Sequence, residues 1–202
     1  MARTQGPDSS RQLRRLETRE RVYEAAVREF ERAGAADADI AAIIASAGVA
    51  RGTFYFHFPT KEHVLAELTA REEQRIAETL IQALVDVADV KSVLAEIIRC
   101  VVNAEITLGE LLFRDVLSFY FSPTFPDVTD SATHPVAVVT IEQIELAQRR
   151  GEVHAEADAA ASGVFFLLGL FALLVTNRDP APARTLLLDK YLHGFVRGLE
   201  TR

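Results

Sequence analysis

The segment at residues 50–61, ARGTFYFHFPTK, holds the side chains with the clearest chemical potential in this chain. Six of them donate hydrogen bonds or carry positive charge: Arg51, Thr53, Tyr55, His57, Thr60 and Lys61. In a helix, which advances about 100° per residue, Phe54 and Phe58 share one face. Gly52 and Phe56 then lie on the opposite face. An arginine, hydroxyls and an outward aromatic ring are unusual on a helix that only meets water, and they suit a helix that enters a groove of DNA.

Local signals around this segment predict two short helices and the start of a third. Ile43 and Ala47 recur at helical spacing within residues 40–47, and Gly48 permits the sharp end that this helix needs. A second helix is expected over about residues 50–57, because Pro59 lacks a backbone donor and disfavours helical geometry at the residue before it. Thr60 is then a candidate N-cap for the third helix.

Residues 18–68 resemble the N-terminal domain of the TetR (tetracycline repressor-like) transcriptional regulators. The shared pattern is an amphipathic helix with a late Phe and a Gly, an isoleucine-alanine helix, an Ala-Gly-Val turn, an aromatic recognition helix and a Pro-Thr-Lys-Glu turn. The matching residues are Phe30, Gly34, Ile43, Ala47, Gly48, Val49, Arg51, Gly52, Thr53, Phe54, Tyr55, Phe56, His57, Phe58, Pro59, Thr60, Lys61, Glu62 and Leu65. The resemblance implies a DNA-binding domain at residues 18–66, preceded by a basic, partly disordered arm at residues 1–17.

The same resemblance implies roles for individual side chains. The expected DNA-binding residues are Arg51, Gly52, Thr53, Tyr55, Phe56, His57 and Lys61. Arg51 is the candidate to reach guanine O6 and N7, and Phe56 to pack on a sugar or a thymine methyl. Phosphates are the expected partners of Lys61 and Tyr55. His57 is expected to contact phosphate as well, although it could serve only as a local cap.

The chain departs from the family pattern at the start of its helices. Ala50 stands where the family often has Ser or Thr, so we expect no hydroxyl cap on the recognition helix. Ala41 and Ala42 stand where the preceding helix often carries a polar or basic residue. Asp39 replaces a frequent Thr, and it can still cap a helix. Base reading is therefore expected to depend mainly on the second helix.

Length and charge limit the classes of protein to which this chain can belong. The chain has 202 residues, of which 49% are hydrophobic and 25% charged, as in an ordinary globular protein of one or two domains. The net charge is −7, so the whole molecule is not a general binder of polyanions. Residues 1–61 nevertheless hold ten Lys and Arg against eight Asp and Glu, and the remainder holds twelve against twenty-one. This asymmetry favours nucleic-acid contact at one end only.

The rest of the sequence predicts further helices and no strand. Residues 1–10 are expected to be disordered, and residues 11–19 to form either a solvated helical extension or an arm that touches DNA. Prolines predict a loop at residues 122–135. Helices are expected over residues 18–33, 60–88, 91–108, 110–121, 136–150 and 158–176, and a last helix is expected to end near residue 200. We therefore predict an all-α fold. The resemblance implies that residues 67–202 form a helical ligand-sensing and dimerisation domain.

The apolar run at residues 164–175 is too short to cross a bilayer, and it reads as a helix buried on all sides. By resemblance, this helix and the last one pair with those of a second subunit. Packing within one chain is the alternative. The expected dimer-interface residues are Val164, Leu168, Phe171, Leu188, Tyr191, Leu192, Phe195, Val196 and Leu199. A dimer also suits the DNA chemistry, because two recognition helices can enter successive major grooves about 34–36 Å apart on a palindromic operator.

The resemblance further implies a small-molecule effector bound in the C-terminal domain. The candidate pocket residues are aromatic or histidine: Phe113, Phe119, Tyr120, Phe121, His134, Phe165, Phe166 and Phe171. Such a lining predicts an apolar or planar ligand. Aromatic residues at helical spacing are also common in plain cores, so the pocket assignment has a structural alternative.

An enzyme is the main competing class. The five histidines form no metal-binding pair, and the sequence contains no HExxH, CxxC or glycine-rich phosphate loop. We therefore expect no catalytic residue, no metal and no cofactor. The lone Cys100 is expected to be a small core residue, and the first ten residues contain no apolar signal region, which favours a cytoplasmic protein. The remaining alternatives are a dimeric DNA-binding regulator without a ligand and, less favoured, a helical protein-interaction module.

Overall fold

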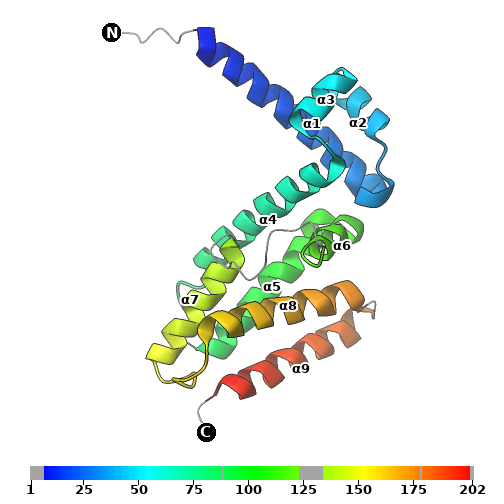
Figure 1. Cartoon of the computed structure of the whole chain (residues 1–202). Coiled ribbons are helices and arrows are strands. Elements are labelled where there is room, and N and C mark those ends of the chain that lie inside the picture. The colour runs from blue at the N-terminus through cyan, green and yellow to red at the C-terminus, as the bar shows by residue number, and fades with distance from the viewer. Residues whose placement is uncertain (1–6, 88, 123–133, 178, 201–202) are drawn as a thin grey trace. The chain divides into compact units, whose positions relative to one another are not determined.

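The computed structural model describes residues 7–87, 89–122, 134–177 and 179–200, and nearly all of them are helical (Figure 1). In chain order the helices are α1 (Pro7–Asp37), α2 (Ile40–Ala47), α3 (Arg51–His57), α4 (Lys61–Ala83), α5 (Val90–Leu108), α6 (Glu110–Phe119), α7 (Pro135–Arg149), α8 (Ala159–Thr176) and α9 (Ala181–Leu199). Within the described residues, the one extended pairing is an isolated bridge between Val153 and Glu200. The predicted all-α fold is confirmed.

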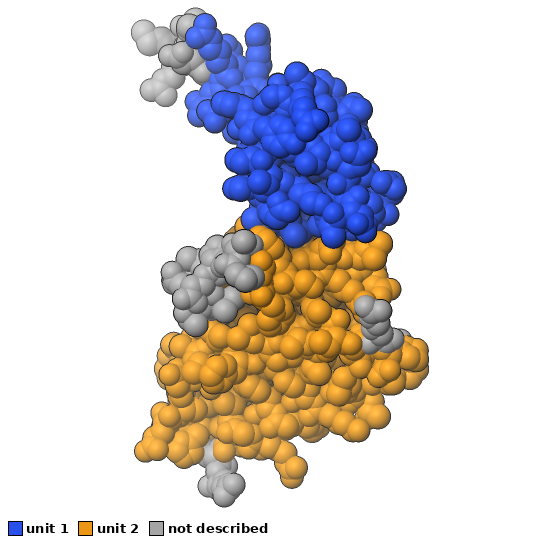
Figure 2. Space-filling model, turned by 45° about the vertical axis from the view of Figure 1, so that its right-hand side comes forward, with its two compact units in different colours: residues 1–68 blue, residues 69–202 orange. Residues whose placement is uncertain are grey.

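The chain forms two compact units, residues 1–68 and residues 69–202, and the division falls inside α4 (Figure 2). Unit 1 contains α1, α2, α3 and the first turns of α4. Its core is a small apolar cluster at helical spacing, contributed by every one of these helices. The fully buried members are Val22, Ala26, Phe30, Ile43, Phe54, Phe58 and Val64.

The N-terminal segment differs from the expected arm. α1 is already helical at Pro7, so residues 7–10 are not disordered as predicted, and the basic segment at residues 11–19 is helical. Contact between this segment and DNA stays a prediction. Arginine, leucine and glutamate favour helix, and the side chains at residues 10–17 are exposed. Residues 1–6 lie outside the described part of the chain. The predicted break near Gly34 is present, with φ 79° and ψ 156° inside α1.

In unit 2, α7 and α8 pack against each other, and α8 lies beside α9 (Figure 1). A Cβ at Gly169 of α8 would come within 2.5 Å of the Tyr191 hydroxyl of α9, so the absence of a side chain permits this close approach. The Tyr191 hydroxyl donates to the Phe166 carbonyl, and the two rings stack with centroids 5.5 Å apart. The proline-rich loop expected at residues 122–135 falls mostly outside the described residues.

The prediction that α8 is buried on all sides is wrong for the chain alone. Phe166, Leu170 and Leu174 are buried, but Phe165 is 66% exposed. α8 is also the one helix, among the residues described, that is long and apolar enough to cross a membrane. This is weak evidence of a span, because core helices have the same composition. Cys100 is buried in α5, and burial raises the pKa of its thiol, as suits the core role expected for it.

Candidate functional site

The recognition helix α3 is defined at both ends by its local sequence. Asp39 is the N-cap of α2, and its carboxylate accepts from the Ala41 amide at 2.8 Å. Gly48 is the C-cap, in the left-handed conformation with φ 63°. Ala50 precedes α3 without any side-chain cap, as its missing hydroxyl predicts. α3 stops at Phe58, which is extended at φ −135° because Pro59 follows it.

The two faces of α3 have opposite environments. Phe54 and Phe58 are buried in the core of unit 1, whereas Phe56 is 65% exposed and Tyr55 is 37% exposed. Gly52 and Arg51 are also exposed, while Thr53 and His57 are half-buried. Within unit 1, α3 therefore presents the predicted outward face, and its buried phenylalanines fix the direction in which that face points.

Arginines from α1 extend the positive charge of this face. The Arg15 guanidinium lies 5.1 Å from the centroid of the Phe56 ring, and that of Arg19 lies 4.4 Å from the Phe58 ring. Arg19 also pairs with Glu67 of α4. The sequence identified the basic segment at residues 11–19, but only the helical geometry singles out Arg15 as the neighbour of the recognition helix.

Two predicted contact residues have local partners. The Arg51 guanidinium donates to the Tyr55 hydroxyl at 3.4 Å and lies 5.6 Å from its ring centroid, so the two form one exposed donor group. Lys61 is half-buried, and its amine donates to the Ala36 carbonyl at the end of α1. The Lys61 amine therefore has a hydrogen-bond partner within the chain, and the sequence did not indicate this contact.

His57 lies at the end of α3 with its ring edge-on to Phe56, at a centroid distance of 5.1 Å. Burial, and then the positive charges of Arg15 and Arg19, lower the pKa of His57 below its usual 6.5. At neutral pH the ring is therefore uncharged, and it can donate one hydrogen bond to a phosphate without adding charge.

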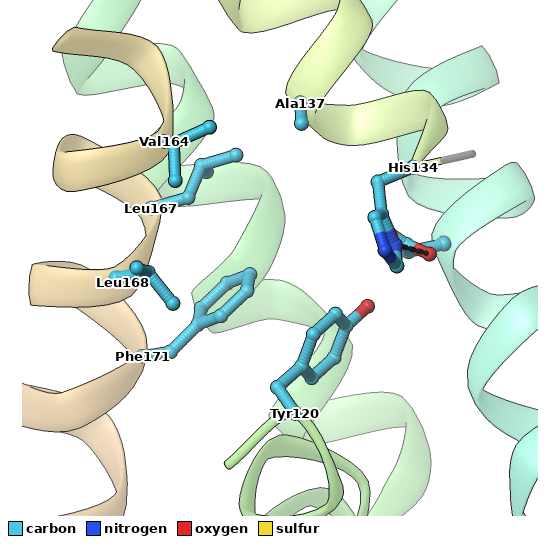
Figure 3. A pocket seen from close by; sticks show the side chains of 8 residues that line it. Tyr120, His134, Ala137, Val164, Leu167, Leu168 and Phe171 are labelled. Carbon is cyan, nitrogen blue, oxygen red and sulfur yellow. Dashed lines mark hydrogen bonds and ion pairs between the residues drawn. The ribbon is translucent and has the colours of Figure 1, made fainter. Parts of the chain in front are cut away.

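Unit 2 contains a small cavity, part of it open to solvent, and Figure 3 shows the side chains that line it. α8 forms an apolar wall with Val164, Leu167, Leu168 and Phe171, and α7 adds Ala137. The polar lining consists of Tyr120, His134 and Glu73.

These three polar residues are buried and interact with one another. His134 Nδ1 lies 3.1 Å from Glu73 Oε2, and the Tyr120 hydroxyl donates to the same carboxyl group. Burial raises the pKa of Glu73, while the contacts with His134 and Tyr120 oppose this rise. Burial and the charge of Glu73 keep the Tyr120 hydroxyl protonated by raising its pKa well above 10.

A second small cavity lies in the same unit and shares Glu73, Tyr120 and Phe171 with the first. Glu73 was not among the predicted site residues. Glu73 lies four residues after Thr69 and four before Ala77, and both of these residues are buried. This spacing places the Glu73 carboxylate on the buried face of α4, and it could have identified Glu73 from the sequence.

The eight predicted pocket residues do not all meet at these cavities. The structure brings Tyr120, His134 and Phe171 to the first cavity and Phe113, Tyr120 and Phe171 to the second. Neither cavity is lined by Phe119, Phe121, Phe165 or Phe166. Phe121 and Phe165 are at least half exposed, and Phe166 packs against Tyr191 and Phe195. The alternation of faces along each helix explains the difference, because neighbouring aromatic residues point in different directions.

The predicted dimer residues also divide into two groups. Leu192, Val196 and Leu199 are buried within the chain, as is Phe171, so these four cannot provide an exposed interface without rearrangement. The residues that keep some exposure are Val164, Leu168, Leu188, Tyr191 and Phe195. Phe165, assigned to the pocket from the sequence, is the most exposed large apolar side chain of α8.

Known proteins similar to this chain are transcriptional regulators. The profile described as "Bacterial regulatory proteins, tetR family" matches residues 22–68, which span most of unit 1. The HTH-type transcriptional regulator YdgC of Bacillus subtilis is 25% identical over 187 residues, covering 90% of this chain and 94% of that protein. The N-terminal domain of the chain, residues 22–68, therefore belongs to the TetR family.

Solved structures share the complete fold of this TetR-family protein. A TetR-family regulator from Pectobacterium atrosepticum superposes with a TM-score of 0.73 and 23% identity, over 94% of this chain and 97% of that one. FadR of Thermus thermophilus, a TetR-family repressor crystallised with lauroyl-CoA, gives a TM-score of 0.70 and 20% identity, over 91% and 96% of the two chains. These structures show the fold: an N-terminal helix-turn-helix domain and a helical C-terminal domain. The family profile and the likeness to YdgC indicate a transcriptional regulator.

Proposed function

We propose that this TetR-family protein is a repressor that binds a palindromic operator as a homodimer and releases it when a small apolar or aromatic effector binds unit 2. The observation that supports the DNA-binding half is the exposed face of α3, where Phe56 and Tyr55 remain uncovered beside the arginines of α1. Such a regulator acts in the cytoplasm, where its operator is accessible.

Each exposed side chain of unit 1 has a proposed contact. Arg51 reads a guanine, and Thr53 contacts a base or a phosphate. Phe56 packs on a sugar or a thymine methyl. Phosphate contacts fall to Tyr55 and His57, with Arg15 as an addition from α1. Lys61 can bind a phosphate only if its amine leaves the Ala36 carbonyl. We therefore propose that Lys61 contributes less to the free energy of DNA binding than the sequence suggested.

The homodimer is proposed from the requirements of the DNA site and from the apolar surface of α8 and α9. A single short helix makes too few base contacts for a specific site, and two copies on a two-fold axis double the contacts. Phe165 and Leu186 are 66% and 55% exposed. Burying such side chains in a partner removes apolar area from water, which favours association.

The proposed effector site is the pair of neighbouring cavities around Tyr120, Glu73 and Phe171. α4 runs from Lys61, just after the recognition helix, to Ala83, so it contributes both to unit 1 and to the cavities of unit 2. A ligand that favours one arrangement of α4 changes the affinity for DNA, and DNA must change the affinity for the ligand by the same factor.

Selection of bound duplexes from a random pool tests the proposed function. We expect recovered sequences to be roughly palindromic, with half-sites about one helical turn apart and two chains bound per duplex. Affinity for a recovered duplex should fall steeply with salt, as counterions are released from several phosphates. Recovery of sequences without a common site, or one chain per duplex, would contradict the proposal.

A further inference from the structure

The first cavity of unit 2 has chemically different ends. Its wall on α8 is entirely apolar, whereas Tyr120, His134 and the Glu73 carboxylate meet at the opposite end (Figure 3). Glu73 is only 7% exposed and His134 only 6%. A buried carboxylate needs an opposite charge or several hydrogen bonds, since burial alone is costly.

We propose that this cavity binds a ligand with an apolar or aromatic body and a positively charged amine, and that the amine pairs with Glu73. This inference rests on the proposed effector-sensing function and specifies the ligand class for it. In the unliganded protein, His134 and the Tyr120 hydroxyl both contact the carboxylate, and His134 is the partner that can carry positive charge. When the ligand binds, its amine replaces His134 as the charged partner of Glu73.

The charges of the lining favour a cation over an anion. Among the described residues that line the two cavities, none is a lysine or an arginine. The second carboxylate, Glu72, is already paired with Arg75 at 2.7 Å. A ligand carboxylate would therefore sit beside Glu73 with no cation other than a shared histidine, and like charges in a buried site repel strongly.

The shape and the aromatic rings of the site suit the same ligand. Tyr120 and Phe171 both line the cavity, with ring centroids 5.0 Å apart. An ammonium group near these ring faces gains further electrostatic attraction. The body of the ligand would then lie against Leu167 and Leu168 of α8.

Protons compete with the amine for the same carboxylate. The titratable groups at the site are Glu73 of α4, Tyr120 after α6 and His134 before α7, and the lining residues of α8 include none. Burial raises the pKa of Glu73, so acidification neutralises this carboxylate at a higher pH than for an exposed one. Amine binding should therefore weaken as the pH falls, and it should begin to do so at a higher pH than for a pairing with an exposed carboxylate.

Three probes of matched shape test the charge preference: 4-phenylbutylamine, 4-phenylbutanol and 4-phenylbutyrate. Titration calorimetry on the full chain at neutral pH should rank them in that order, with the amine binding at least about tenfold tighter than the carboxylate. Glu73→Gln should remove the preference for the amine and keep binding of the alcohol, which also shows that the cavity is intact. Glu78→Gln, on the exposed face of α4, is the matched control and should leave the ranking unchanged.

The outcomes separate this inference from the proposed function. Tightest binding by the carboxylate, an amine preference that survives Glu73→Gln, or no binding by any probe would overturn the cation site. If the alcohol or the carboxylate binds best and releases the selected duplex, effector sensing stands and the charge assignment fails. If the amine binds through Glu73 but leaves DNA affinity unchanged, the cation site stands and effector-controlled release fails.

Discussion

Phe54 and Phe56 stand two residues apart in α3, and their different environments separate folding from recognition. Phe54 has no exposed surface, and Phe56 has 65% of its surface exposed. Helical periodicity alone predicted this contrast, because residues two apart lie on opposite faces of a helix. The periodicity could not show that Arg15 lies against Phe56, since that contact depends on how α1 and α3 pack.

Replacing each phenylalanine by alanine should therefore have opposite effects. We expect Phe54→Ala to lower the free energy of unfolding by about 3–5 kcal/mol, because it leaves a cavity in a small core. Phe56→Ala should change the free energy of unfolding by no more than about 0.5 kcal/mol and weaken DNA binding. Urea denaturation and DNA titration measure the two effects. A large loss of stability in Phe56→Ala would show that the ring is part of the core.

Arg51 and Arg15 should differ in specificity. Arg51→Ala should cost about 1–3 kcal/mol of binding free energy and relax one operator position, because the arginine reads a base. Arg15→Ala should weaken binding to all duplexes alike and reduce the salt dependence, because it contacts phosphate. Titrations against single-site operator variants distinguish the two. Arg99→Ala, an exposed charge on α5, is the control for net charge, and equal losses for Arg51→Ala on every variant would contradict base reading.

At the scale of elements, the helix ends of unit 1 follow from short-range chemistry. Asp39, Gly48 and Pro59 set the limits of α2 and α3 where the sequence predicted them. The start of α1 was not predictable in the same way, because the exposed basic segment has helix-forming residues but no apolar face of its own. The positions of the cavity residues also required the structure, since they come from four separate segments.

The two caps of the helix-turn-helix should respond differently to substitution. Asp39→Ala should lower the free energy of unfolding by about 1 kcal/mol, because the Ala41 amide loses its acceptor. Ala50→Ser should raise the free energy of unfolding by about 0.5–1 kcal/mol by adding the missing hydroxyl acceptor to α3. Denaturation of the full chain, followed by helical circular dichroism, measures both. No loss in Asp39→Ala would show that the observed cap contributes nothing to stability.

At the scale of the whole molecule, the proposed function depends on a second copy of the chain. The sequence indicated α8 and α9 as the pairing helices, but three of the residues that it assigned to the interface are core residues of α9. A fully apolar helix such as α8 gives no periodic signal of which face a partner covers, so sequence reasoning could not choose among its residues.

Phe165 provides the test of the proposed dimer. Phe165→Glu should produce monomers in analytical ultracentrifugation, because it would bury a charge in an apolar interface, and specific DNA binding should fall with dimer formation. The helical circular dichroism should remain. Val85→Glu changes a side chain of 76% exposure just after α4 and should leave the dimer intact. A dimer that persists in Phe165→Glu would place the interface elsewhere.

DNA covers the outward face of α3 in the proposed complex, and thiol labelling measures this directly. Cys100 is the single cysteine of the chain and is buried, so Phe56→Cys introduces one exposed thiol in the middle of that face. The duplex selected from the random pool should slow maleimide labelling of this thiol on both chains of the dimer, whereas a thiol introduced by Val85→Cys should react at an unchanged rate. If Phe56→Cys binds the selected duplex and still reacts as fast as the free protein, DNA does not cover α3 and the regulator is engaged through another surface.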